Sequence, residues 1–119
     1  MDRVGDASEL LSRLMSASTL RAKVLSENIA NQNVPGFKRQ IVRFEELLAK
    51  SLDTGAHSLD GVEPEIVTDL ATPSGPDGNN VSLEVENNAM RANWLLYQTY
   101  AAIVQTRNEM LRASISEGR

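Results

Sequence analysis

The sequence predicts an all-α fold: an elongated antiparallel hairpin of two long, coiled-coil-like helices. Apolar and small residues recur every three or four positions over residues 6–33 and again over 81–116, which is the helical period. The stretch 53–80 between them carries six acidic residues and no Lys or Arg. A helix from 82 to 116 would be ~50 Å long at about 1.5 Å per residue, but a compact chain of this size is only ~35 Å across. The fold must therefore be elongated.

The length of 119 residues corresponds to one domain. It contains only five aromatic residues, so the bulky side chains that usually anchor a globular core are scarce, which disfavours a compact enzyme. We expect a single domain over 1–119 with four parts. They are an N-terminal helix (6–33), a turn, extended segment and short helix (34–50), a flexible acidic loop (51–80) and a C-terminal helix (81–116).

The first helix is predicted by residues on one face and by signals at both ends. Asp6 is a plausible N-cap, and Glu9 three positions later would complete a capping box. The helix should end within 31–33, because Val34 precedes Pro35 and is pushed out of the helical region. The residues that recur on one face are Ala7, Leu11, Met15, Ser18, Ala22, Leu25 and Ile29.

The middle of the chain is less regular. Pro35-Gly36 suits a tight turn, and the segment 37–44 is rich enough in β-branched and aromatic residues to be extended. Residues 45–50 favour a short helix. From 51 to 80 there are several turn signals and too little hydrophobicity to order the backbone alone, so we expect an irregular acidic loop that is mobile unless a neighbour holds it.

The C-terminal helix has a heptad seam, and Ser82 can cap its start. Glu84 and Glu86 would be charges of its first turn, where the helix dipole favours anions, rather than a catalytic pair. A second row (Ala89, Leu96, Tyr100, Ile103 and Met110) widens the apolar stripe, so more than one neighbour should pack on this helix and other subunits are needed to cover it. The seam consists of Met90, Trp94, Tyr97, Ala101, Val104, Asn108, Leu111 and Ile115.

The sequence offers no set of residues for catalysis. It has no cysteine and His57 is its one histidine, so a Ser/His/Asp triad, an HExxH motif or a zinc site of the usual ligands cannot be assembled within the chain. We therefore expect no enzyme, no cofactor and no metal. Lys38, Arg39 and Arg43 form a small basic patch without a helix-turn-helix pattern, which favours solvated or intersubunit ion pairs over nucleic-acid binding.

Membrane insertion and secretory targeting are also not indicated. No 18-residue apolar stretch is present, so we expect no membrane span. The N-terminus lacks the basic region followed by an apolar run that a cleaved secretory signal needs. If the chain leaves the cytoplasm, it should do so by another route.

The segment 25–38, LSENIANQNVPGFK, resembles the L-x-x-N-I-A-N-x-x-T-P-G-[YF]-K signature of bacterial flagellar axial proteins, the rod, hook and hook-associated subunits. Within that family the short length and the segments 42–48 and 77–86 are most similar to the proximal rod subunits. One departure is Val34, where the family usually has Thr, and we expect a lost side-chain hydrogen bond there rather than a different fold. The matching motif residues are Asn28, Ile29, Ala30, Asn31, Pro35, Gly36 and Phe37.

This resemblance implies a single rod-type domain that assembles with copies of itself and with other rod and basal body proteins into the periplasmic drive shaft, which transmits torque for motility. It implies export through the flagellar type III apparatus without a cleaved signal peptide, and helical ends that are poorly ordered before assembly. It implies no chemistry, no small-molecule substrate and no nucleic acid. The alternative is a helical export chaperone or adaptor, which would form a stable helical dimer and bind other export cargo.

For several residues the sequence allows two different roles. Asn28 and Asn31 would either cap the end of their helix or join subunits. Phe37 and Phe44 would be core or intersubunit contacts, and Asn108 would fix register or face solvent. Trp94, Tyr97 and Tyr100 favour a packed seam over a ligand cage. The expected subunit-packing residues are Leu11, Met15, Leu25, Phe44, Met90, Trp94, Tyr97, Val104 and Leu111.

Overall fold

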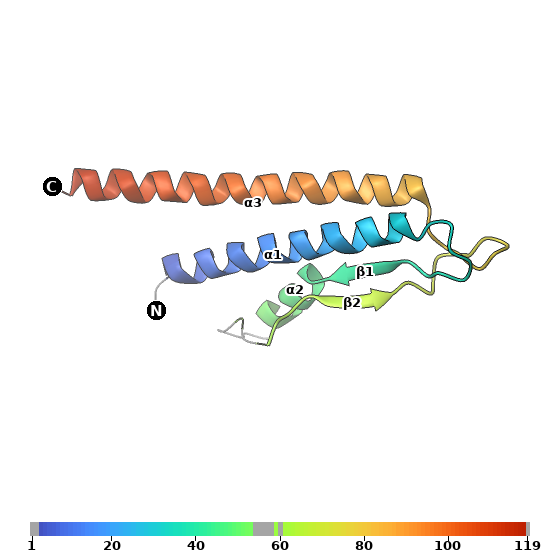
Figure 1. The fold of residues 1–119 in the computed structure, drawn as a ribbon. Coiled ribbons are helices and arrows are strands. Elements are labelled where there is room, and N and C mark those ends of the chain that lie inside the picture. Colours follow the sequence, from blue (N-terminus) through green and yellow to red (C-terminus); the bar gives the residue numbers. More distant parts are fainter. Residues whose placement is uncertain (1–2, 54–58, 60, 119) are drawn as a thin grey trace.

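Two long antiparallel helices form the body of the molecule, and a β-ribbon with a short helix lies along one side of them (Figure 1). The computed structural model describes residues 3–53, 59 and 61–118. Its extents are 68 × 29 × 15 Å and its radius of gyration is 18.4 Å, against ~13.5 Å for a compact chain of this length. The elongated helical hairpin predicted from the sequence is confirmed.

The first helix, α1 (Arg3–Ala30), begins three residues earlier than predicted. The assignment of Asp6 as N-cap is wrong, because nothing before it breaks the helix and it lies inside the first turns. Glu9 forms an (i, i+4) ion pair with Arg13, with 3.2 Å between Glu9 Oε1 and Arg13 Nη2, instead of completing a capping box. The helix ends at Ala30, one residue before the predicted range of 31–33, and turns follow.

The fold is not all-α, because two strands pair in the middle of the chain. Strand β1 (Gln40–Arg43) lies in the segment expected to be extended, and β2 (Glu65–Thr68) lies in the segment expected to be an irregular loop. They are antiparallel, with Ile41 opposite Val67 and Val42 opposite Ile66. Cross-strand pairs of β-branched residues stabilise a two-stranded ribbon. The acidic neighbours of Ile66 and Val67 concealed this short β signal.

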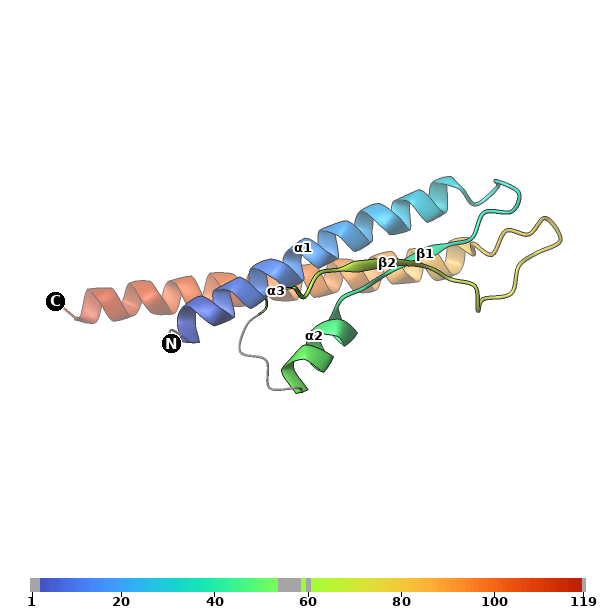
Figure 2. The same cartoon turned by 90° about the horizontal axis from the view of Figure 1, so that it is seen from below.

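Helix α2 (Glu45–Asp53) confirms the predicted short helix and extends it by three residues. Glu45 and Glu46 lie in its first turn and Lys50 in the last, as the helix dipole favours, although the acidic Asp53 is its final residue. Figure 2 shows α2 and the ribbon beside the pair of long helices. The apolar core lies between α1 and the side of the molecule that carries α2 and the ribbon. His57 and Asp60 lie outside the described residues. The core consists of Ala17, Phe44 and Leu48, with Leu10, Leu14, Leu59 and Val62 packed against it.

The last helix, α3 (Leu83–Glu117), is 35 residues long and therefore ~52 Å. Ser82 caps it as predicted, since its hydroxyl oxygen accepts a hydrogen bond from the Val85 N–H. Its C-terminal end extends beyond the start of α1 (Figures 1 and 2). The predicted heptad differs from the structure at one position, because Asn93 is buried and bonded to α1 whereas its neighbour Trp94, which the heptad placed there, is 60% exposed.

Candidate assembly surface

Asn28 joins α1 to the outer edge of β1. Its Nδ2 donates to the Gln40 carbonyl at 2.8 Å and its Oδ1 accepts from the Gln40 N–H at 2.9 Å, so the amide takes the place of a neighbouring strand. The side chain is 1% exposed. Neither role expected from the sequence, a helix cap or a contact between subunits, describes it: Asn28 is an internal link between α1 and β1.

Glu86 lies in the first turn of α3, as predicted, and its side chain is completely buried. One carboxylate oxygen, Oε1, accepts from Arg39 Nε at 2.5 Å, and the other, Oε2, accepts from Asn28 Nδ2 at 3.2 Å. A buried carboxylate is tolerated when it is paired and hydrogen-bonded. Glu86 therefore ties the start of α3 to α1 and to the residue before β1.

Arg39 lies between two carboxylates. Besides Glu86, it contacts Asp69, with 2.9 Å between Arg39 Nη1 and Asp69 Oδ2. The hydrogen bond to Glu86 is the main reason that the pKa of Arg39 is raised, against the opposing effect of burial, and Asp69 adds to it. The pKa of Asp69 lies well below its ordinary value because the Thr72 hydroxyl and N–H donate to it, followed by Arg39.

The Asn80 side chain links the two strands of the ribbon just beyond their paired residues. Its Oδ1 accepts from the Arg39 N–H at 2.6 Å and its Nδ2 donates to the Asp69 carbonyl at 2.8 Å. The amide therefore bridges the residues next to β1 and β2. We call Asn28, Arg39, Asp69, Asn80 and Glu86 the buried polar cluster. It holds α1, the ribbon and α3 in one arrangement at one end of the hairpin.

Two turns interlock beside this cluster. The Gly36 N–H donates to the Asp77 carbonyl at 2.9 Å, and Asn79 Nδ2 donates to the carbonyls of Asn31 and Val34 at 2.9 and 2.8 Å. Gly78 has a φ of 83°, and a Cβ there would lie 3.3 Å from Gly36 Cα. A side chain at this position is therefore disfavoured both by the backbone and by the close approach of the turns.

The remaining motif residues are placed around these turns. Asn31 Nδ2 donates to the Glu27 carbonyl at 2.8 Å, which confirms the capping role that the sequence left open for it. Ile29 and Phe37 are half-buried, whereas Ala30, Pro35 and Gly36 are exposed. The Phe37 N–H donates to the Val34 carbonyl at 3.2 Å. The family motif thus builds the closed end of the hairpin through contacts within the chain.

Arg21 connects α1 to three other elements. Its guanidinium donates to Glu45 Oε2 at 2.6 Å, to Asn93 Oδ1 at 3.3 Å and to the Val42 carbonyl at 3.4 Å. Burial alone would raise the pKa of Glu45, but the hydrogen bond from Arg21 and backbone N–H groups lower it overall. Asn93 Nδ2 also donates to the Ser18 carbonyl at 2.8 Å, so α3 is tied to the α1 backbone.

The basic patch expected between Lys38 and Arg43 is used within the chain. Lys38 bonds to Ser74 and to the Gly78 carbonyl, and Arg43 pairs with Glu46 at 3.0 Å between Nη2 and Oε2. With Arg39 also paired, the intersubunit ion-pair role proposed for this patch is not what the structure shows. In the described part of the chain, no three His, Cys, Asp or Glu residues are grouped so as to hold a metal ion. No described helix is long and apolar enough to cross a membrane.

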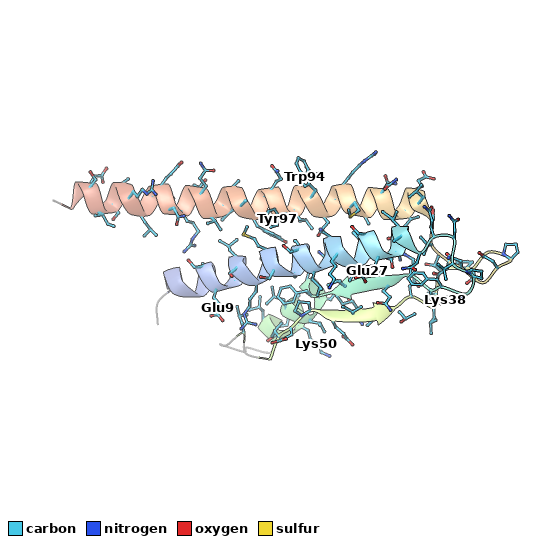
Figure 3. The ribbon with its side chains drawn as sticks, viewed as in Figure 1. Glu9, Glu27, Lys38, Lys50, Trp94 and Tyr97 are labelled. Atoms are coloured by element: carbon cyan, nitrogen blue, oxygen red, sulfur yellow. The ribbon has the colours of Figure 1, made fainter. Side chains whose placement is uncertain are left out.

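The nine expected packing residues divide by burial. Leu11, Leu25 and Phe44 are buried within the single chain. Tyr97 points to α1 and Trp94 points away from it (Figure 3). Met15, Met90 and Val104 are half-buried, whereas Trp94, Tyr97 and Leu111 are exposed.

Ten of the fourteen large apolar residues that are exposed in the described part of the chain lie on α3, and this is the candidate assembly surface. Soluble monomers rarely expose a long apolar stripe unless it is an interaction site. Asn108, whose role the sequence left open, is exposed on this helix. The large apolar residues exposed on α3 are Leu83, Val85, Trp94, Leu95, Leu96, Tyr97, Ile103, Met110, Leu111 and Ile115.

Sequence reasoning missed most of the buried polar residues. The signal was present in the segment 77–86, where Asp-Gly-Asn-Asn is followed by an acidic residue one helical turn after the Ser82 cap. Two adjacent asparagines at a turn can bond to backbone groups of other segments. The missed residues are Arg21, Arg39, Asp69, Asn79, Asn80, Glu86 and Asn93.

Comparison with known proteins agrees with the resemblance seen in the motif. No family model matches the chain. The flagellar basal body rod protein FlgB of Aeromonas hydrophila is 32% identical over 71% of this chain and 74% of its own length, and that of Borreliella burgdorferi is 30% identical over 71% and 77%. FlgB of Proteus mirabilis is 21% identical over 99% of both chains. The chain belongs to the FlgB family of flagellar basal body rod proteins.

Proposed function

We propose that the chain is a structural subunit of the proximal rod of the flagellar basal body, where it packs against copies of itself and related rod proteins and transmits motor torque through the periplasm. Membership of the FlgB family supports a place in the rod. Its relatives are named as rod proteins, which is consistent with a role that involves no catalysis.

The observation that carries this proposal is the apolar surface that the hairpin leaves open. The chain exposes 8128 Å², whereas a compact monomer of this mass exposes ~6,300 Å². The excess of about 1,800 Å² is what one or two interfaces of ordinary size would cover. The exposed apolar residues include Trp94, Tyr97 and Leu111 on α3, which we propose as residues that contact other subunits.

The internal contacts support the same role. The buried polar cluster joins α1, the ribbon and α3, so we propose that 1–119 acts as a single rod-type domain in which the closed end of the hairpin is rigid. A subunit that transmits torque needs elements that do not slide past each other. Charge-assisted hydrogen bonds with fixed geometry meet that need better than apolar contacts alone.

We also propose that the chain is exported through the flagellar type III apparatus, a route that is implied by the resemblance of the segment 25–38 to flagellar axial proteins. The alternative role as an export chaperone or adaptor is favoured by no contact among the described residues. Such a protein would hide its apolar face in a stable dimer, which requires a closed, self-complementary surface.

Complementation tests the proposal. A flagellated strain that lacks its own FlgB-family protein is supplied with this chain, and basal bodies are examined by electron microscopy together with swimming assays. We expect rods and motility to be restored to at least part of the wild-type level. Secretion of the chain without rod formation, in a strain where a native relative restores rods, would contradict the proposal. A control chain truncated before α3 should restore neither.

A further inference from the structure

A groove runs along the open side of the hairpin between α1 and α3. It is lined by Leu11 and Met15 of α1 and by Tyr97 and Val104 of α3, with Ser12 and Ser16 on the α1 side. This part has a volume of about 400 Å³, and a second cavity of about 260 Å³ continues it past Thr19 and Tyr97. The groove is therefore mixed in character: apolar side chains come from both helices, small polar ones from α1, and Arg107 and Asn108 from α3.

A different side of α3 carries an exposed seam with heptad spacing. Its large residues are Leu96, Ile103 and Met110, seven positions apart, and a small residue precedes each of them by four positions. None of the six positions is charged, and all six are exposed. Charge depletion is typical of the core of a protein interface. The seam consists of Ala92, Leu96, Thr99, Ile103, Thr106 and Met110.

One threonine on each of the two surfaces, Thr99 and Thr19, is compatible with burial. Thr99 on the seam donates its hydroxyl to the Leu95 carbonyl at 2.8 Å, and Thr19 at the groove donates to the Met15 carbonyl at 3.1 Å. Because each hydroxyl is bonded inside its own helix, burying it leaves no unpaired polar group.

The two surfaces do not overlap on α3. Each large seam residue stands one position before a groove residue, as Leu96 does before Tyr97 and Ile103 before Val104. Successive helical residues are ~100° apart around the axis. One chain can therefore use its groove and its seam at the same time, toward two different neighbours.

We propose that the seam of one copy of this chain fills the groove of the next copy. The lengths match, since the groove runs from Ser8 to Ala22 and the large seam residues from Leu96 to Met110, fourteen positions in each case and thus ~21 Å. The shapes match as well, because large side chains on the seam meet small ones on the groove wall.

A second copy is the occupant that the exposed area favours. The excess exposure of about 1,800 Å² equals roughly two faces of ~800 Å², the size that a standard interface buries on each partner. Because the two faces differ, the contact is heterologous and continues from copy to copy as an open helical array instead of closing into a dimer. This inference rests on the proposed role in the rod and specifies which surfaces copies share.

Engineered cysteines test the contact, since the chain contains none of its own. A variant with Ser16→Cys in the groove wall and Ile103→Cys in the seam is oxidised at high concentration and in purified basal bodies. We expect a ladder of dimers, trimers and larger species on a non-reducing gel. The matched control replaces Ile103→Cys by Gln105→Cys, an exposed position on another side of α3, and should give no ladder.

Three results would overturn the inference. They are dimers formed by Ile103→Cys alone as the main product, cross-links only to another rod protein, or no ladder from the double variant. As a second measurement, Ile103→Glu should abolish rods while Ile103→Leu and Gln105→Glu retain them, and rods formed by Ile103→Glu would also overturn it. The double-cysteine variant under reducing conditions distinguishes failure of the seam-in-groove contact from failure of the proposed function. If this reduced variant forms no rods in a strain where a native relative does, the proposed function itself is in question.

Discussion

Glu86 of α3 and Arg39, the residue before β1, form an ion pair with 2.5 Å between Oε1 and Nε, and the carboxylate is completely buried. Asn28 donates to the second carboxylate oxygen. Three segments that are distant in the sequence thus meet at one charge. Through these contacts Glu86 links the start of α3 to the residue before β1 and to α1.

Glu86→Ala should destabilise the chain by about 3–5 kcal/mol, because removing one partner of a buried pair leaves the other charge uncompensated. Urea unfolding followed by circular dichroism measures this change. The control is Glu84→Ala, which removes an exposed carboxylate from the same turn and should change stability by less than about 1 kcal/mol. Equal effects of the two substitutions would show that the Glu86 pair does not hold α3.

Asn28→Asp should also destabilise the fold. An aspartate cannot donate to the Gln40 carbonyl, and it would place a second negative charge beside Glu86. A buried acceptor left without a donor costs about 1–3 kcal/mol, and charge repulsion adds to it. The matched control is Asn33→Asp at an exposed turn position. If thermal unfolding of the two variants coincides, the bond between α1 and β1 contributes nothing to stability.

Acid should weaken the ribbon through Asp69. Its pKa is below the ordinary value of 3.8 in the folded chain, so its contribution to stability is fully present above about pH 4 and is lost as the pH falls through the folded pKa. The stability difference between the parent chain and Asp69→Asn should therefore be constant from pH 7 to pH 5 and shrink below pH 4. A difference that grows on acidification would contradict this assignment.

Charges on the two sides of the hairpin should have different consequences. Leu25→Asp places an unpaired charge at a position that is buried inside the chain, so it should unfold α1 and α3 together. Leu111→Asp lies at an exposed position, so the isolated chain should keep its helicity but fail to form rods. Circular dichroism and a swimming assay separate the two effects. Loss of helicity in Leu111→Asp to the same extent would show that this position belongs to the monomer core.

Helical period was sufficient to predict both long helices, because each buries one face against the other over many turns. The end of α1 near Asn31 and the cap at Ser82 were also predictable, since they depend on local chemistry at Pro35 and at the serine hydroxyl. The start of α1 was not, because Asp6 as a cap and Asp6 as a first-turn residue have the same local sequence.

The strand β2 and the buried polar cluster could not be predicted from the local sequence. Ile66 and Val67 form a strand only because β1 lies opposite them, so the decisive contact is not local. Glu86 resembles an ordinary first-turn acid until the phase of α3 against α1 is known. That phase is fixed by Asn93, which is bonded to the Ser18 carbonyl. Apolar periodicity predicts Trp94 at this position instead, because asparagine and serine are polar.

The most direct test of the claim that other subunits cover the apolar sides of α3 is an electron cryo-microscopy map of basal bodies assembled with this chain. The account predicts that α3 lies inside the rod wall, with the side chains of Trp94, Ile103 and Leu111 each in contact with a neighbouring subunit. A map in which these side chains of the assembled chain face solvent would contradict it.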